Sequence, residues 1–92
     1  MSRSVRKAVP LLLKKFEEAS KLPCSVIAFD MEIPPSNYYL YRDGRGNPTC
    51  KTLDKMIEIV RVQHPEILED WLLLQLEELR AEIKQKHSIK NS

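Results

Sequence analysis

The 92-residue sequence has few of the residues that mark specialised protein classes, and each shortage excludes a class. Two cysteines, Cys24 and Cys50, are too few for a disulfide-stabilised scaffold, so we interpret both as free thiols. An apolar run such as residues 71–74 is far shorter than the roughly 20 residues of a membrane span. The charged residues that directly follow Leu13 argue against a secretory signal peptide. We therefore expect a cytoplasmic protein with no membrane partner.

Motifs of catalysis, cofactor binding and metal binding are also missing. The sequence has no nucleophile with a nearby base, no glycine-rich phosphate loop and no CxxC or HExxH spacing. A zinc site would need both cysteines together with His64 and His87, whose separations match no usual pattern. We therefore expect no enzyme activity, no catalytic or metal-binding residue, no cofactor and no small-molecule substrate.

What is present is the composition of one small globular domain. Apolar residues make up 42% and charged residues 30% of the chain, which excludes a disordered protein. The net charge of +2 does not by itself indicate nucleic acid, but it is unevenly spread: residues 1–62 carry +4 and residues 63–92 carry −2. The first part is the better candidate to meet a polyanion, with residues 1–8 as a basic arm. The alternative for residues 1–8 is an ordinary solvated terminus.

The spacing of apolar residues predicts an all-α fold of four to five helices, and strand signals are nearly absent. Pro10 either kinks a helix within residues 4–19 or marks its first turn, and we favour a helix that starts near Val9. Further helices are predicted at residues 23–32, from 35 or 36 to 43, from 49 or 52 to 63, and at 65–86. Both glycines, Gly44 and Gly46, lie in a loop before the fourth helix.

Two short helices joined by a tight turn, followed by this loop and another helix, are the layout of a helix-turn-helix. From Leu13 to Met56, about half of the chain, the sequence resembles the lambda-repressor-like (Cro/repressor, Xre-type) DNA-binding domains without a gap. The residues that carry this resemblance are Leu13, Phe16, Leu22, Ile27, Ala28, Met31, Ile33, Ser36, Tyr38, Tyr41, Gly44, Asn47, Pro48, Thr52, Leu53 and Met56. In this pattern Ala28 lets two helices cross closely, Ile33 plugs the turn, and Gly44 ends a helix.

The resemblance implies a small sequence-specific transcriptional regulator in the bacterial cytosol or nucleoid. It would be a phage- or plasmid-type repressor that binds an inverted-repeat operator in double-stranded DNA as a homodimer, with the helix at residues 35–43 in the major groove. The implied base-contact candidates are Pro35, Ser36, Asn37, Tyr39, Leu40 and Arg42. The implied DNA-backbone contacts are Cys24, Asp43, Arg45, Asn47, Lys51 and Lys55, with Arg3, Arg6 and Lys7 in the arm.

The chain then divides into four parts. Residues 1–8 form the arm, 9–63 the helix-turn-helix DNA-binding domain, 64–86 a C-terminal helix and 87–92 a disordered tail. We expect the C-terminal helix to form the dimer interface, because its apolar surface is broad for one small domain. The candidate interface residues are Leu68, Trp71, Leu72, Leu76, Leu79 and Ile83. The alternative is that this helix closes the core of its own domain.

The sequence departs from the family pattern at three places. Glu32 stands where the turn usually has glycine, and Pro23-Cys24 stands where many members have Ser/Thr-Gln. The helix that would read bases opens with Pro34-Pro35, where members often carry Ser, Arg or Gln. These departures motivate an alternative, a protein-binding module that keeps the fold without specific DNA binding. Such an adaptor, antirepressor or viral accessory factor would use Tyr39 and Leu40 as a protein contact.

Overall fold

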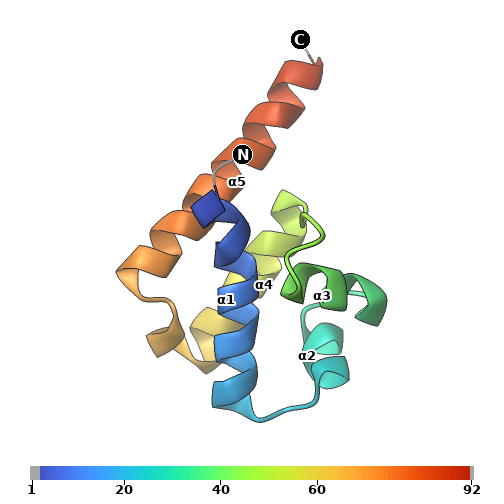
Figure 1. The fold of residues 1–92 in the computed structure, drawn as a ribbon, viewed down its shortest axis with the longest axis vertical. Helices are drawn as coiled ribbons and strands as arrows, with labels where there is room; N and C mark the ends of the chain where they lie inside the picture. Colours follow the sequence, from blue (N-terminus) through green and yellow to red (C-terminus); the bar gives the residue numbers. More distant parts are fainter. Residues whose placement is uncertain (1–2, 92) are drawn as a thin grey trace.

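From Arg3 to Asn91, the part of the chain that the structure describes, helices follow one another without interruption by any strand (Figure 1). The computed structural model describes the backbone of residues 3–91 and the side chains of residues 8–70 and 72–84. The α-helices are α1 (Arg3–Ser20), α2 (Cys24–Asp30), α3 (Pro35–Arg42), α4 (Cys50–Gln63) and α5 (Asp70–Asn91), and a 3₁₀ turn, η1 (Pro65–Ile67), precedes α5. Within these residues the all-α class and the predicted number of helices are confirmed. No described helix is both long and apolar enough to cross a membrane.

The first helix, α1, contacts both α3 and α5 and lies between them in Figure 1. It begins at Arg3, so the predicted start near Val9 is wrong, and residues 3–8, expected as an arm, form its first turns. Pro10 lies inside the helix, and its ring packs against the loop, since a Cβ on Gly44 would lie 3.5 Å from it. Ala8 and Val9, the two residues before the proline, are both buried. We infer that this burial offsets the backbone hydrogen bond that the proline removes.

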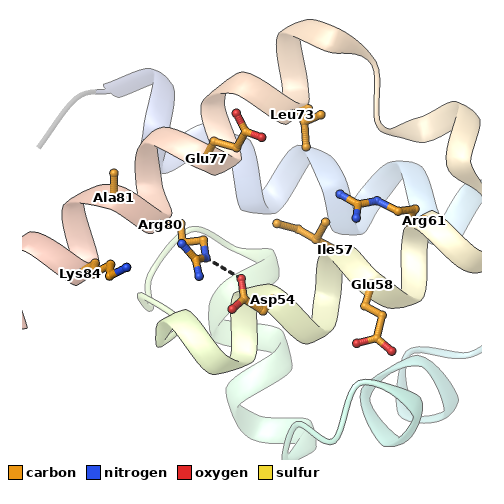
Figure 2. Close-up of a pocket in the computed structure, with 9 residues that line it drawn as sticks. All are labelled: Asp54, Ile57, Glu58, Arg61, Leu73, Glu77, Arg80, Ala81 and Lys84. Carbon is orange, nitrogen blue, oxygen red and sulfur yellow. Dashed lines mark hydrogen bonds and ion pairs between the residues drawn. The ribbon is translucent and has the colours of Figure 1, made fainter.

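Two helices in the second half of the chain, α4 and α5, are joined by an ion pair (Figure 2). Arg80 Nε donates a hydrogen bond to Asp54 Oδ1 at 2.8 Å. Of the two predicted starts of α4, residue 49 or 52, the earlier one is confirmed: Thr49 is the N-cap, and its Oγ1 accepts a hydrogen bond from the backbone N–H of Thr52 at 3.2 Å.

The last helix is shifted along the chain relative to its predicted range of 65–86. The chain first makes the turn η1, which buries Ile67, and α5 starts only at Asp70. α5 runs to Asn91, so residues 87–91 continue the helix where a disordered tail is predicted, and Ser92 lies outside the described residues. The far end of α5 projects beyond the other helices (Figure 1).

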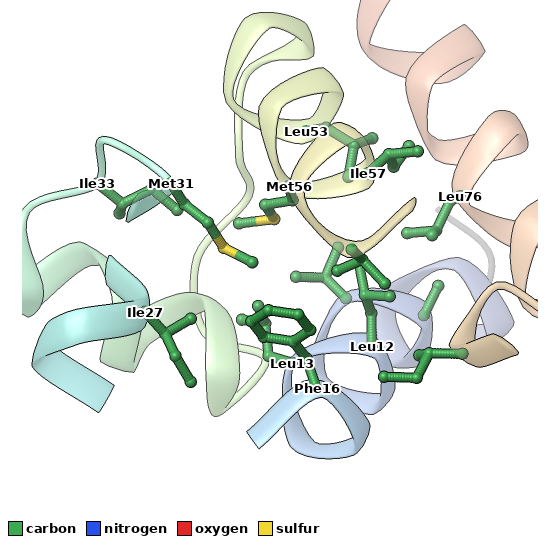
Figure 3. Close-up of a cluster of buried hydrophobic side chains, with 14 of the residues drawn as sticks. Leu12, Leu13, Phe16, Ile27, Met31, Ile33, Leu53, Met56, Ile57 and Leu76 are labelled. Carbon is green, nitrogen blue, oxygen red and sulfur yellow. The ribbon is translucent and has the colours of Figure 1, made fainter. Parts of the chain in front are cut away.

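One hydrophobic core joins all five α-helices (Figure 3). The largest fully buried side chains are Tyr38, Phe16, Leu12, Leu13, Ile27, Met31, Leu53, Met56, Leu72, Leu76 and Val60. As the turn pattern predicts, Ala28 and Ile33 are buried too. In α2, Ile27 is buried and Val26 is exposed. The core is therefore built mainly from the residues that the helical spacing predicts.

The packing of α5 corrects the predicted dimer interface. Leu72, Leu76 and Leu79 are buried in the core of their own domain, and Leu68 and Ile83 are partly buried against it. The physical reason is that α5 lies along α1, which already covers the apolar stripe of α5. The alternative, a helix that closes its own core, holds for these residues. The side chain of Trp71 lies outside the described residues.

Candidate nucleic-acid interface

The candidate interface is built around the turn from α2 to α3, in which Glu32 has a left-handed backbone conformation with φ of 58°. The N–H of Glu32 donates to the carbonyl of Phe29 at 3.0 Å, and the N–H of Ile33 donates to the carbonyl of Ala28 at 2.9 Å. These two bonds form a Schellman motif, which fixes the direction in which the chain leaves α2. The position where the resemblance expects glycine is thus a glutamate held in a glycine-like conformation.

One side of α3 is fixed against α1 through Glu17. The hydroxyl of the completely buried Tyr38 donates a hydrogen bond to Glu17 Oε2 at 2.6 Å. Arg42 Nε, one turn further along α3, lies 2.8 Å from the same oxygen. Burial, reinforced by the bond to Glu17, raises the pKa of Tyr38, and attraction to Glu17 raises the pKa of Arg42. This pairing holds the Arg42 guanidinium beside α1, so Arg42 would have to leave Glu17 to reach a base.

The other side of α3 is open to solvent. The remaining predicted base contacts, Pro35, Ser36, Asn37, Tyr39 and Leu40, are all exposed, and the structure brings them together around one short helix. Tyr39 is 46% exposed and Leu40 38% exposed, while their neighbour Tyr38 is buried. The N-cap of α3, Pro34, offers no side-chain acceptor, so the first-turn N–H groups of Ser36 and Asn37 have no cap.

Two of the predicted backbone contacts are basic residues that already have acidic partners. Arg45 Nη2 lies 3.0 Å from Asp43 Oδ2, and Lys55 Nζ lies 3.1 Å from Glu32 Oε2. The bond to Glu32 raises the pKa of Lys55. A phosphate that approached either cation would therefore compete with a carboxylate, which lowers the electrostatic attraction of this face for DNA.

Lys51 is the exception. It is exposed in the first turn of α4 and forms no ion pair with any described residue. A lysine at a helix N-terminus is unfavourable for the helix, because it adds positive charge to the positive end of the macrodipole. Asn47, in the loop before α4, is also exposed. Both residues are therefore free to meet a phosphate where the resemblance expects one.

The remaining predicted DNA-backbone contacts are Cys24, at the start of α2, and three basic residues near the start of the chain. Cys24 opens α2 and is half-buried, and burial together with the Glu17 carboxylate raises the pKa of its thiol. Its side chain is therefore a neutral thiol packed against the core, and the backbone N–H at the start of α2 stays the group predicted to meet a phosphate here. Arg3, Arg6 and Lys7 belong to α1, but their side chains lie outside the described residues.

An exposed apolar stripe on α2 was missed by the sequence analysis. Phe29 is 81% exposed, Val26 on the same helix is 40% exposed, and Leu22, just before the helix, is 39% exposed. The signal was present in the spacing of three residues between Val26 and Phe29, which places these two on one face of α2. It was overlooked because the buried residues Ile27 and Ala28 account for the apolar character of the segment.

The described residues contain no group of three or more His, Cys, Asp or Glu side chains that could hold a metal ion. No family model, curated protein or solved structure matches the chain. What can be said of its function therefore comes from the residues and the geometry themselves.

Proposed function

We propose that the protein binds double-stranded DNA through α3 and acts as a small transcriptional regulator of the phage- or plasmid-repressor kind in the bacterial cytosol or nucleoid. The observation that carries the proposal is the two-sidedness of α3. One side is fixed by Tyr38 and its bond to Glu17, and the other exposes Ser36 and Asn37 at an uncapped helix start. A rigid helix with exposed polar residues in its first turn is what base recognition in a major groove requires.

The exposed side chains suit particular base contacts. The Asn37 amide can make a paired hydrogen bond with adenine, and the Ser36 hydroxyl can bond to several bases. Tyr39 and Leu40 offer apolar surface to a thymine methyl group. Lys51 and Asn47 lie beyond the end of α3, where they can position the duplex through its phosphates. Because Arg45 and Lys55 are partly neutralised, we expect modest non-specific affinity and a strong dependence on sequence.

Binding of the full chain to a fluorescent pool of random-sequence duplexes tests the electrostatic part of this proposal. We expect affinity to fall as salt rises, and Lys51→Ala to reduce the slope of log affinity against log salt by about one phosphate contact. Lys14→Ala, an exposed lysine on α1, is the matched control and should leave the slope unchanged. Binding that ignores salt, or equal effects of the two variants, would contradict the proposal.

The base-reading role of Asn37 needs a sequence readout. After selection of preferred sequences, Asn37→Ala should lose discrimination at one base position, at a penalty of about 1–3 kcal/mol, while other positions keep theirs. Gln63→Ala, an exposed amide at the far end of α4, serves as the matched control. A uniform loss at every position would indicate that Asn37 positions the protein and does not read a base.

A second candidate function, a protein-binding module, is favoured by the exposed Phe29 together with Tyr39 and Leu40. Exposed aromatic and aliphatic side chains of this size are common anchors of protein interfaces. The two functions are separated by Phe29→Ala, which removes apolar surface from α2 without touching α3. DNA binding should survive this change, whereas a protein contact centred on α2 should not.

A further inference from the structure

The exposed side of α3 carries no charged side chain. All of α3, Pro35–Arg42, is described, and its exposed residues are Pro35, Ser36, Asn37, Tyr39 and Leu40. Arg42, the one charged residue of the helix, is only partly exposed, and its Nε lies 2.8 Å from Glu17 Oε2. The side of α3 that would face base edges therefore offers an amide, hydroxyl groups and apolar surface.

This lack of charge bears on G·C pairs. In the major groove guanine presents two acceptors, and its commonest specific partner is an arginine or lysine that donates to both. Cytosine presents an amino donor, which a carboxylate accepts. The exposed side of α3 has neither group, and Arg45 in the loop after α3 is paired with Asp43. A G·C pair beneath this side would give up water without gaining a charged partner, which lowers affinity.

The groups that are present match A·T pairs. The Asn37 amide both donates and accepts, so it can bond to N6 and N7 of one adenine. Leu40 follows Asn37 by three residues and lies on the same face of the helix, where it can cover a thymine methyl group. Tyr39 adds a ring that is held edge-on to the buried Tyr38, with centroids 6.0 Å apart. A ring that is already held in place loses little freedom on binding.

We propose that the DNA bound by this protein has A·T pairs at the positions that α3 covers, with Asn37 reading an adenine and Leu40 covering a thymine methyl group beside it. This inference rests on the proposed function and names its substrate class. The preference is a difference between two affinities: an A·T pair meets matched partners, and a G·C pair meets none. Lys51, which would contact a phosphate, adds affinity to both kinds of site alike.

A preference for A·T pairs has a second physical source, which the test must separate. Runs of A·T pairs have a narrow minor groove that attracts cationic side chains, whatever the major groove presents. Two base analogues change the major-groove edge alone. Deoxyuridine lacks the methyl group of thymine, and 7-deazaadenine lacks the N7 acceptor of adenine, while both keep the base pair and its minor-groove edge.

The experiment uses the full chain and the duplex that it selects from a random pool, with each analogue placed in turn at the α3-covered positions. Wild-type affinity should fall at least about fivefold with 7-deazaadenine and about threefold with deoxyuridine. Asn37→Ala should respond to deoxyuridine only, and Leu40→Ala to 7-deazaadenine only. Leu74→Ala, at an exposed leucine on α5, is the matched control and should respond to both.

A gain of specificity gives an independent test. Asn37→Arg restores to this side of α3 the cation that guanine requires, so the pair selected at that position should change from A·T to G·C. An unchanged selection would contradict direct reading at residue 37. Circular dichroism checks that each variant is folded. If Leu40→Ala is not, the response of the wild-type protein to deoxyuridine still tests the methyl contact.

The possible failures are distinct. A selected site with G·C pairs at the α3-covered positions would overturn the inference and leave DNA binding standing. Equal binding of natural and analogue duplexes would also overturn it, because the preference would then come from the shape of the DNA. Failure to select any site would overturn the proposed function itself.

Discussion

The α2–α3 face and the groove between α4 and α5 (Figure 2) are both exposed, but they differ in how many of their charged side chains form ion pairs within the domain. Around α3 the cations are tied to carboxylates of the same face, as in the pairs Arg45–Asp43 and Lys55–Glu32. In the groove, Asp54–Arg80 is the single ion pair among six charged residues. The face that keeps few free charges offers polar and apolar groups for a specific contact. The groove leaves four charged side chains without an ion pair among the described residues, namely Glu58, Arg61, Glu77 and Lys84.

The largest expected effect on stability concerns the buried side of α5, which packs against the core of its own domain. Leu76 is completely buried, so Leu76→Ala should lower the free energy of unfolding by about 3 kcal/mol. Leu74→Ala, at a side chain that is largely exposed, is the matched control and should change it by less than about 0.5 kcal/mol. Urea denaturation followed by circular dichroism gives both numbers, and similar losses would contradict the packing of α5.

The next effect concerns the pairing that fixes α3. Glu17→Ala leaves the buried Tyr38 hydroxyl without its acceptor and should lower the free energy of unfolding by about 2 kcal/mol. Asp43→Ala breaks an exposed ion pair with Arg45 on the same face and should lower it by no more than about 0.5 kcal/mol. The contrast between the two variants is the result to measure. Equal losses would mean that Glu17 does not fix α3.

The same pairing predicts a dependence on pH. The folded protein holds the pKa of Tyr38 above the usual tyrosine value of about 10. The stability that this shift contributes is fully present below pH 10 and is lost as the pH rises above it, because the unfolded chain then releases a proton that the folded chain keeps. The stability difference between wild type and Tyr38→Phe should therefore shrink above pH 10. A difference that stays constant with pH would show that burial does not hold the proton on Tyr38.

The smallest expected effect on stability concerns the residues that follow the ends of α1 and α2. Lys21 and Glu32 both have a left-handed φ of 58°, which glycine adopts with less strain. Lys21→Gly should raise the free energy of unfolding by about 0.5 kcal/mol. Glu32→Gly should gain less, since it also removes the ion pair with Lys55. Thermal melting compares the stability gained by the two variants. A gain for Glu32→Gly that equals or exceeds that of Lys21→Gly would mean that the pair with Lys55 does not stabilise the fold.

Much of this fold could be predicted from local patterns. The helical spacing of Leu53 and Met56, the position of Gly44 after α3 and the cap at Thr49 are all encoded within a few residues of where they act. Gly44, with φ of 77°, ends α3 as predicted. Features that depend on distant residues could not be predicted. Pro10 lies inside α1 rather than at its start, and its ring lies beside Gly44 of a loop far along the chain, which no local rule contains.

The candidate site shows the same limit. The exposed side of α3 follows from helical geometry once Tyr38 is known to point inward. The pairing of Arg42 with Glu17 does not, because it joins two helices whose approach is set by the whole core. An apolar stripe such as that of α5 likewise shows that a helix must be covered, but not whether its own domain or a second chain covers it.

The most direct test of the central claim is a selection of random-sequence duplex DNA by the purified full chain, read out by sequencing. Recognition through the exposed side of α3 predicts an enriched sequence, and binding as a twofold homodimer predicts that it is an inverted repeat with half-sites about one helical turn apart, about 10 base pairs. No enrichment by folded protein would contradict DNA recognition by α3 and would make the apolar surface around Phe29 the leading candidate for a protein partner.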